Sequence, residues 1–159
     1  MLEIGPGPGA ATEWLRRRVP HLVAVEVDPD VAAQLAIKLA DANVDVIAGD
    51  ATKLEFAEAS FDSVGTFTML HHLPTVAQQN DVFREALRVL RPGGVLVGSD
   101  SLHSTELHEF HESDVYNPIE PSSLLVRLQS IGFTDVMVRV GYDVRFSARK
   151  PEADAALCQ

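Results

Sequence analysis

Short apolar runs alternate with segments of helical period along almost the whole of this sequence. Such alternation is typical of strands joined by crossover helices in a mostly parallel sheet. The chain has 159 residues, of which 46% are hydrophobic, and its composition shows no split along its length. This is the size of one globular domain that can bury a proper core. We therefore expect a single α/β domain built on a doubly wound sheet.

Seven segments have the length and apolar character of strands, and the last two would form a hairpin. Residues 134–140 and 143–149 are separated only by Gly141 and Tyr142, and so short a connection makes two strands antiparallel. The sequence therefore predicts a mostly parallel seven-stranded sheet with an antiparallel C-terminal hairpin. The expected strands cover residues 1–4, 22–27, 44–48, part of 61–70, 95–99, 134–140 and 143–149.

Capping residues indicate where the helices begin and end. Asp28 followed by Pro29 is typical of an N-cap with proline at the first helical position. Thr75 with Gln78 predicts a capping box, and Gly132 marks the end of a later helix. The expected helices cover residues 10–19, from 29 onward, from 76 to the Arg91-Pro92-Gly93-Gly94 stop, and around 124–131.

Gly5, Gly7 and Gly9 follow the first expected strand directly. A glycine-rich turn lets the backbone approach a ligand at the carboxyl end of the sheet, although alone it could merely connect a strand to a helix. Glu26 ends the second strand about twenty residues later, where a carboxylate can accept hydrogen bonds from both hydroxyls of a ribose. Asp50 follows the third strand and would face the same crevice. Together these residues predict a nucleotide-type cofactor site.

The ordered motifs of the chain resemble the class I S-adenosylmethionine-dependent methyltransferases of the small-molecule type. The likeness runs along nearly the whole chain. It is carried by Leu2-Glu3-Ile4-Gly5-Pro6-Gly7-Pro8-Gly9, Val25-Glu26-Val27-Asp28, Gly49-Asp50-Ala51, Phe61-Asp62-Ser63-Val64, Leu70-His71-His72-Leu73 and Leu87-Arg88-Val89-Leu90-Arg91-Pro92-Gly93-Gly94. The resemblance implies a Rossmann-like methyltransferase fold, methyltransferase activity and S-adenosylmethionine as the cofactor.

The resemblance also implies roles for nine residues around the cofactor. Glu3 with Gly5, Gly7 and Gly9 would lie by the methionine part, Glu26 would hold the ribose, Asp50 with the Ala51 amide would read the adenine, and Phe67 with Thr68 would flank the sulfonium. The implied acceptor is a small molecule. Methyl transfer from a sulfonium is an in-line displacement, so the main contribution of the enzyme is proximity and alignment.

A nicotinamide-dependent oxidoreductase is the nearest rival within this fold. Such enzymes normally space their glycines as G-x-G-x-x-G, whereas the glycines here read G-x-G-x-G. The second carboxylate, Asp50, also suits the amino group of adenine better than the pyrophosphate of a dinucleotide. These two features favour the methyltransferase.

The histidines are the candidate catalytic residues. His71 and His72 lie just after the fourth strand, where a general base helps if the acceptor is a weakly acidic group. The alternative is a structural role, because Leu-His-His-Leu recurs in the family across different substrates. His103, His108 and His111 lie in an acidic segment after the fifth strand, where substrate contact and a solvated linker both remain open. We expect no metal site, because a metal needs a convergence of ligands that spacing alone does not show.

The composition of the chain restricts the kinds of binding partner that we expect for it. The net charge of −10 works against binding the phosphate backbone of a nucleic acid. The longest apolar runs have the length of strands, so we expect no membrane span and a cytoplasmic protein. Cys158 is alone, which excludes an internal disulfide. We expect residues 1–150 to form the S-adenosylmethionine-binding domain and residues 151–159 to form a flexible tail.

Family members usually carry helices before the glycine-loop strand, whereas only Met1 and Leu2 precede Glu3 here. We therefore expect a truncated form of a longer protein; an open cofactor site and a cover supplied by another subunit are the alternatives. A non-catalytic methyltransferase-like module that binds a ligand or a protein partner is the second functional hypothesis. An apolar edge exposed where those helices are missing would also favour a homodimer.

Overall fold

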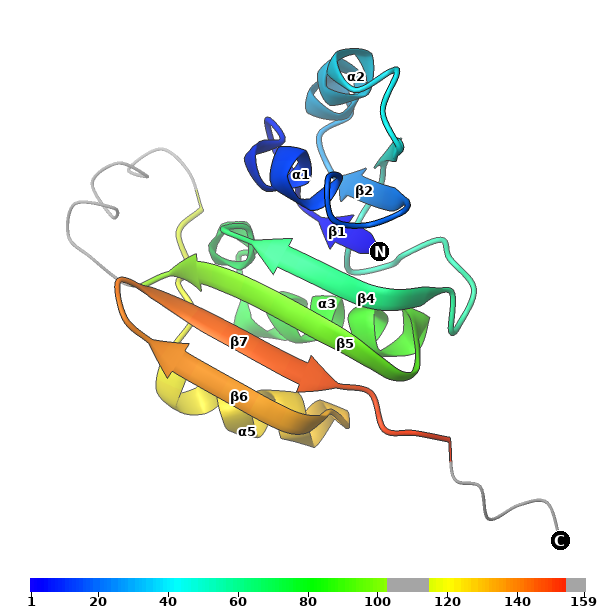
Figure 1. Cartoon of the computed structure of the whole chain (residues 1–159). Helices are drawn as coiled ribbons and strands as arrows, with labels where there is room; N and C mark the ends of the chain where they lie inside the picture. Colours follow the sequence, from blue (N-terminus) through cyan, green and yellow to red (C-terminus); the bar gives the residue numbers. More distant parts are fainter. Residues whose placement is uncertain (103–114, 154–159) are drawn as a thin grey trace, which may run out of the picture.

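A seven-stranded sheet organises residues 1–102 and 115–153, the part of the chain that the computed structural model describes (Figure 1). Across the sheet the strands are β3 (Val44–Ala48), β2 (Leu22–Glu26), β1 (Leu2–Ile4), β4 (Phe61–Phe67), β5 (Leu90–Ser101), β7 (Asp143–Arg149) and β6 (Thr134–Val140). β1 to β5 pair in parallel, whereas β7 runs antiparallel to both β5 and β6. The predicted fold class, with its antiparallel C-terminal hairpin, is confirmed.

Helices cover both faces of this sheet. They are α1 (Ala10–Leu15), α2 (Pro29–Lys38), α3 (Val76–Val89) and α5 (Pro121–Ile131), with a short 3₁₀ turn, η1 (Leu70–His72). Successive side chains of β1 face opposite ways, as in any strand. Leu2 and Ile4 share the core cluster with Phe83 of α3, whereas Glu3 interacts with Thr12 of α1 on the other face. In Figure 1, α3 and α5 lie behind the half of the sheet formed by β4 to β6.

The predicted caps at Asp28, Thr75 and Gly132 are confirmed, but the capping box is only half formed, because the Gln78 side chain accepts from the Thr75 hydroxyl and not from its amide. The Asp28 carboxylate accepts hydrogen bonds from the amides of Asp30 and Val31 at 2.8 and 3.2 Å, at the start of α2. The Thr75 hydroxyl accepts from the Gln78 amide at 3.2 Å, at the start of α3. Each cap satisfies amides that have no partner within the helix. At the end of α5, Gly132 has a φ of 118°, a left-handed conformation that suits glycine.

α1 is shorter than the sequence predicts, because it ends at Leu15 rather than near Val19. The side-chain amide of Asn43 donates to three carbonyl oxygens between Arg16 and Pro20, at 2.9 to 3.1 Å. These carbonyls therefore have partners outside the helix, and the chain can turn before Pro20 without leaving them unsatisfied.

Trp14 of α1 is 58% exposed. The guanidinium of Arg18 lies 3.8 Å from the centroid of its ring, a cation–π contact at the surface. The indole therefore packs against a neighbouring cation at the surface and not in the core.

β5 begins earlier than predicted, at Leu90 rather than Val95. The glycines of this segment favour a turn, and α3 does end just before it. However, the Gly93 amide donates to the Lys150 carbonyl at 3.0 Å, and the Lys150 amide donates to the Gly94 carbonyl at 2.9 Å. The chain after β7 thus supplies partners that extend the strand through a turn-like sequence.

The core lies between the sheet and the helices α3 and α5. Phe83 of α3 packs edge to face against Phe146 of β7, with ring centroids 5.9 Å apart. Leu124 and Leu128 of α5 are fully buried in the same cluster. Within residues 1–102 and 115–153, every helix is too short or too polar to cross a bilayer.

Candidate functional site

A cleft of about 720 Å³ opens at the carboxyl ends of the parallel strands. Its walls come from the segments that follow β1, β2, β3 and β4, and so it lies where the strand order reverses between β1 and β4. Folds of this kind bind their ligands at such a switch point. Seven of the nine predicted cofactor residues line the cleft: Gly5, Gly7, Glu26, Asp50, Ala51, Phe67 and Thr68.

The three loop glycines all have a positive φ, but for different reasons. Gly5 has a φ of 67°, and a β-carbon there would collide with the Met69 side chain. Gly9 has a φ of 88°, and a β-carbon there would lie 2.5 Å from the Leu35 side chain. A β-carbon at Gly7, with a φ of 52°, would meet no protein atom within 4 Å. Gly5 and Gly9 are therefore required by packing, whereas Gly7 leaves open space beside the cleft.

The Glu26 carboxylate joins the glycine loop to the end of β2. One oxygen, Oε2, accepts a hydrogen bond from the Gly7 amide at 3.0 Å, and Oε1 accepts from the Asp28 amide at 3.2 Å. Only 8% of the residue is exposed, and it lines the cleft. Each carboxylate oxygen has a second lone pair, so Glu26 can accept further hydrogen bonds from a ligand.

Asp50 follows β3 and is held by its own loop. Its Oδ1 accepts hydrogen bonds from the Thr52 hydroxyl at 2.7 Å and from the Thr52 amide at 2.8 Å. These hydrogen bonds, the hydroxyl first, lower the pKa of the Asp50 carboxyl below its ordinary value. The cleft therefore has the side chain of Glu26 on the segment after β2 and an ionised carboxylate, that of Asp50, on the segment after β3.

Glu3 does not line the cleft but lies buried on β1 beside Thr12 of α1, 1% exposed. Burial raises the pKa of its carboxyl to about 7, and the nearby Thr12 side chain offsets a little of this rise. The two groups are not in hydrogen-bonding geometry, and both Glu3 oxygens and the Thr12 hydroxyl lack a hydrogen-bond partner. Such orphaned groups are costly. The carboxyl therefore suits a proton or a nearby cationic group of a ligand.

The end of β4 forms the wall of the cleft next to the glycine loop, since β4 pairs with β1. Thr68 has a φ of 55°, which is unusual for a residue other than glycine. Its amide donates to the Ser99 carbonyl at 2.8 Å, so the strained residue is held by β5. This conformation turns the chain at Phe67 so that Met69 and the following turn also line the cleft.

The two predicted catalytic histidines occupy different environments. His72 lines the cleft, and Leu73 lies beside it. His71 is 3% exposed and absent from the cleft lining, and its Nδ1 lies 2.6 Å from Oδ1 of Asp100. The other Asp100 oxygen accepts from the Leu70 amide at 2.8 Å. Of the two histidines, only His72 is therefore positioned to meet a ligand in the cleft.

Sequence reasoning missed Asp100 and several apolar wall residues. Asp100 comes directly at the end of the apolar run of β5, and the same position after β2 and β3 marked Glu26 and Asp50. The sequence therefore contained a signal for Asp100, and the prediction did not use it. The apolar wall residues have no chemical signal of their own and are recognisable only as neighbours of predicted ones: Val25, Val27, Val31, Met69 and Leu73.

The predictions for His103, His108, His111 and Cys158 concern residues outside the described part of the chain, as does most of the predicted tail. Within residues 1–102 and 115–153, no group of three histidine, cysteine or acidic side chains could hold a metal ion.

The strand order and the cleft at its switch point define the class of the fold, a Rossmann-like sheet of the kind found in solved S-adenosylmethionine-dependent methyltransferases. A family model described as the methyltransferase domain matches residues 2–98, and the chain belongs to that family.

Two curated relatives illustrate the range of the family. The chain is 32% identical over 139 residues to the probable ribosomal RNA small subunit methyltransferase A of Methanothermobacter thermautotrophicus, with 80% of this chain and 49% of that protein covered. It is 34% identical over 105 residues to the demethylmenaquinone methyltransferase of Renibacterium salmoninarum, with 66% and 42% covered. The chain therefore spans less than half the length of these relatives.

Solved structures show the same fold at low sequence identity. A SAM-dependent methyltransferase from Methanosarcina mazei has a TM-score of 0.82 at 14% identity, with 96% of this chain and 92% of that chain covered. The Haemonchus contortus phosphoethanolamine N-methyltransferase 2, in complex with S-adenosyl-L-methionine, has a TM-score of 0.80 at 17% identity, with 96% and 48% covered.

Proposed function

We propose that residues 1–150 form a domain that binds S-adenosylmethionine in this cleft and transfers its methyl group to a small-molecule acceptor. The observation that carries the proposal is that Glu26, Asp50 and the glycine loop line the same cleft. Carboxylates at the ends of two neighbouring strands are spaced for two separate groups of one nucleoside, its ribose and its base. The family of the chain supports the same ligand.

The cleft residues divide between the parts of this ligand. Glu26 accepts the ribose hydroxyls, and Asp50 with the Ala51 amide contacts the adenine. The orphaned Glu3 carboxyl suits the amino group of the methionine part, because both of its oxygens are buried without a hydrogen-bond partner. Phe67 and Thr68 flank the sulfonium. These residues would hold the ligand, with the end of β4 beside its sulfonium.

The bound ligand supplies an activated methyl group on sulfonium, so the protein needs no covalent nucleophile. The protein aligns the acceptor with the methyl and excludes water. Where the acceptor is a hydroxyl, His72 is placed to accept its proton, because it is the histidine that lines the cleft. His71 can act only indirectly, since its Nδ1 contacts Asp100.

A small molecule is the proposed acceptor, although some relatives are named as ribosomal RNA methyltransferases. The net charge of −10 disfavours contact with a phosphate backbone. The side chains around the proposed methyl position are mainly apolar: Phe67, Met69 and Leu73. Both features support an uncharged or weakly acidic acceptor. The homodimer remains a prediction, which analytical ultracentrifugation would test.

Isothermal titration with S-adenosylmethionine and S-adenosylhomocysteine tests the proposal. We expect wild-type protein to bind both, and Glu26→Gln and Asp50→Asn each to weaken binding about tenfold, since each loses charge-assisted hydrogen bonds. Asp45→Asn is the matched control, because Asp45 is an exposed carboxylate of β3 outside the cleft. No binding by wild-type protein would exclude the proposal.

Two further arms separate the alternatives. Binding of NAD in place of S-adenosylmethionine would indicate the oxidoreductase. Binding of S-adenosylmethionine without methyl transfer to any of a panel of hydroxyl, amine and carbon acceptors would indicate the non-catalytic module. The expected result is methyl transfer to at least one small acceptor, at a rate about tenfold lower in Asp50→Asn when S-adenosylmethionine is subsaturating.

A further inference from the structure

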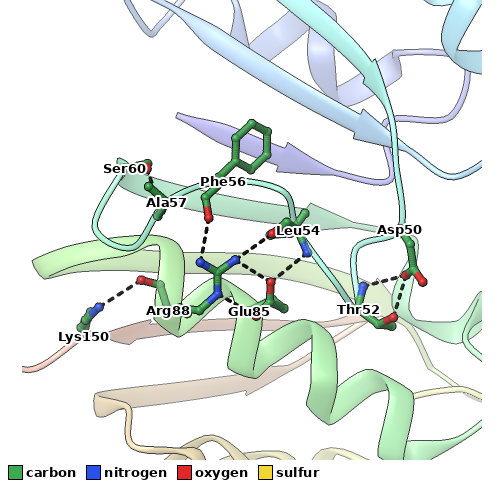
Figure 2. A network of polar contacts seen from close by, with 9 residues as sticks. All are labelled: Asp50, Thr52, Leu54, Phe56, Ala57, Ser60, Glu85, Arg88 and Lys150. Atoms are coloured by element: carbon green, nitrogen blue, oxygen red, sulfur yellow. Dashed lines mark hydrogen bonds and ion pairs between the residues drawn. The ribbon is translucent and has the colours of Figure 1, made fainter.

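The loop between β3 and β4 begins in the cleft with Asp50 and Ala51 and then leaves it. Figure 2 shows that α3 holds the next part of this loop from outside. Two nitrogens of the Arg88 guanidinium donate to the carbonyl oxygens of Phe56 and Leu54, at 2.7 and 2.8 Å. The Leu54 amide donates to Oε2 of Glu85 at 2.8 Å. One ion pair on α3 therefore satisfies three backbone groups of the loop.

The ion pair between Glu85 and Arg88 is itself well formed. Nε and one terminal nitrogen of Arg88 contact the two oxygens of Glu85 at 2.8 and 2.7 Å, a bidentate geometry. The side chains are only 19% and 29% exposed. The hydrogen bond from Arg88 is the main cause that lowers the pKa of the Glu85 carboxyl. A partly buried bidentate pair with further hydrogen bonds is more rigid than an exposed ion pair.

Few residues separate this anchor from the cleft. The Lys53 amide donates to the Asp50 carbonyl at 3.0 Å, and Thr52 holds the Asp50 carboxylate, so residues 50–53 form one compact turn. The turn leads directly into Leu54. A displacement of Leu54 is thus transmitted to Asp50, because the turn between them has little freedom of its own.

We infer that Glu85 and Arg88 are positioning residues, which hold the loop that carries Asp50 and Ala51 and thereby set the affinity of the cleft for the nucleoside part of its ligand. The inference rests on the proposed function for the identity of the ligand, but the restraint on the loop is a property of the protein alone. None of the cleft-lining residues belongs to α3, so the effect is exerted from outside the site.

The same helix offers a matched control. Arg84 and Asp81 form an ion pair of the same spacing at 2.6 Å, but their side chains are 59% and 46% exposed and make no hydrogen bond to a loop in the described part of the chain. Arg88→Gln and Arg84→Gln therefore remove equal charge from α3 and differ in the loop contacts. Arg88→Lys keeps the charge but has one nitrogen in place of the guanidinium fork, so it is the conservative variant.

The first measurement is hydrogen exchange at single amides in the ligand-free protein. We expect Arg88→Gln to speed exchange of the Leu54 and Lys53 amides about tenfold, and Arg84→Gln to leave both unchanged. Unchanged exchange at Leu54 in Arg88→Gln would overturn the inference. This result does not depend on any ligand, so it decides the restraint even where wild-type protein fails to bind S-adenosylhomocysteine and the proposed function fails.

The second measurement is titration with S-adenosylhomocysteine and with 5′-methylthioadenosine, which has the nucleoside but no amino-acid part. Arg88→Gln should raise both dissociation constants by the same factor, about tenfold, with Arg88→Lys in between. A merely structural role would lower the melting temperature and leave both affinities of the folded protein unchanged, which would overturn the positioning role.

A charge swap, Glu85→Arg with Arg88→Glu, separates the loop contacts from the ion pair. The swap restores an oppositely charged pair three residues apart on α3, but it leaves the Leu54 amide without its acceptor and the two carbonyls without their donors. We expect the swap to bind both ligands as weakly as Arg88→Gln. Wild-type affinity in the swap would show that the ion pair alone is needed and would contradict the inference.

Discussion

Gly5 and Gly7 lie two positions apart in the same loop, with similar φ values of 67° and 52°, yet they differ in what surrounds them. A side chain at Gly5 would collide with Met69, whereas a side chain at Gly7 would enter empty space beside the cleft. One glycine therefore serves the packing of the protein, and the other leaves room for a ligand.

Substituting these two glycines should separate stability from binding. Gly7→Ala pays only the left-handed backbone strain, about 1–2 kcal/mol. Gly5→Ala adds an overpacking term of similar size. We expect Gly5→Ala to lower the free energy of unfolding more than Gly7→Ala does. For each kcal/mol of lost stability, we expect Gly7→Ala to weaken S-adenosylhomocysteine binding more than Gly5→Ala does. Urea unfolding and calorimetric titration measure the two effects. Equal loss of binding per unit of stability would contradict this assignment.

Glu3 gives the protein a pH dependence of known sign. Its pKa is about 7 in the folded protein, against 4.5 as its ordinary value. Between these values the folded protein keeps a proton that the unfolded chain has lost. The contribution of Glu3 to the free energy of unfolding is therefore most favourable below pH 4.5. This contribution is lost as the pH rises toward and through 7. The loss is on the order of 3 kcal/mol.

Glu3→Gln should remove this dependence, because the amide has nearly the same shape and no proton to lose. Urea unfolding at several values of pH should show the variant gaining stability relative to wild-type protein as the pH rises from 4.5 to 7.5. A constant difference between the two proteins across this range would show that the carboxyl is not the titrating group. The signal for this behaviour was absent from the sequence, since burial of a carboxylate without a partner depends on the packing of α1 over β1.

Among the elements, η1 is held by side chains from three distant parts of the chain. Asp100 of β5 accepts from the Leu70 amide, Gln79 of α3 donates to the Leu70 carbonyl at 3.1 Å, and Asn117 donates to the Leu73 carbonyl at 3.0 Å. A short turn of this kind has little stability of its own. Its position beside the cleft is therefore imposed by the surrounding fold.

Asp100→Asn tests this dependence. Asparagine retains one acceptor oxygen in place of two, so either the Leu70 amide or the His71 ring loses its oxygen partner in a buried site. We expect a loss of about 2 kcal/mol, which lowers the melting temperature by roughly 4–8 °C. The control is Asp62→Asn, because Asp62 is an exposed carboxylate paired with Arg91, and we expect almost no change there. Equal effects in both variants would refute a special role for Asp100.

The type of each helix or strand was predictable wherever the local sequence signal was strong. The predicted boundaries were wrong where residues distant in the sequence determine the end of an element. The caps at Asp28 and Thr75 contain their own partners, so local sequence was sufficient. The end of α1 depends on Asn43, and the start of β5 depends on Lys150. Both partners are far away in sequence, and no local pattern could have indicated them. The cleft was predictable for a related reason, since its residues follow strands that the apolar runs already marked.

At the scale of the whole molecule, the net charge of −10 shapes which acceptors can approach. A protein that neutralises several phosphates loses affinity steeply as salt rises. We expect fluorescence anisotropy to show no binding to a ribosomal RNA hairpin near physiological salt, and no steep increase on lowering the salt. An uncharged dye-labelled peptide controls for non-specific signal. Tight, salt-sensitive RNA binding would contradict the small-molecule acceptor and favour the activity named for the ribosomal relatives.

α3 contacts both walls of the cleft without contributing to its lining. Gln79, near its start, holds the turn that carries His72, and Arg88, nine positions later, holds the loop that carries Asp50. At the rise of an α-helix these two anchors stand about 14 Å apart along the axis. The length of α3 between Gln79 and Arg88 therefore sets the distance between the two walls of the cleft that a ligand must bridge. Inserting one residue between the anchors would rotate one by about 100° relative to the other, pulling one wall out of register while leaving every cleft residue chemically intact.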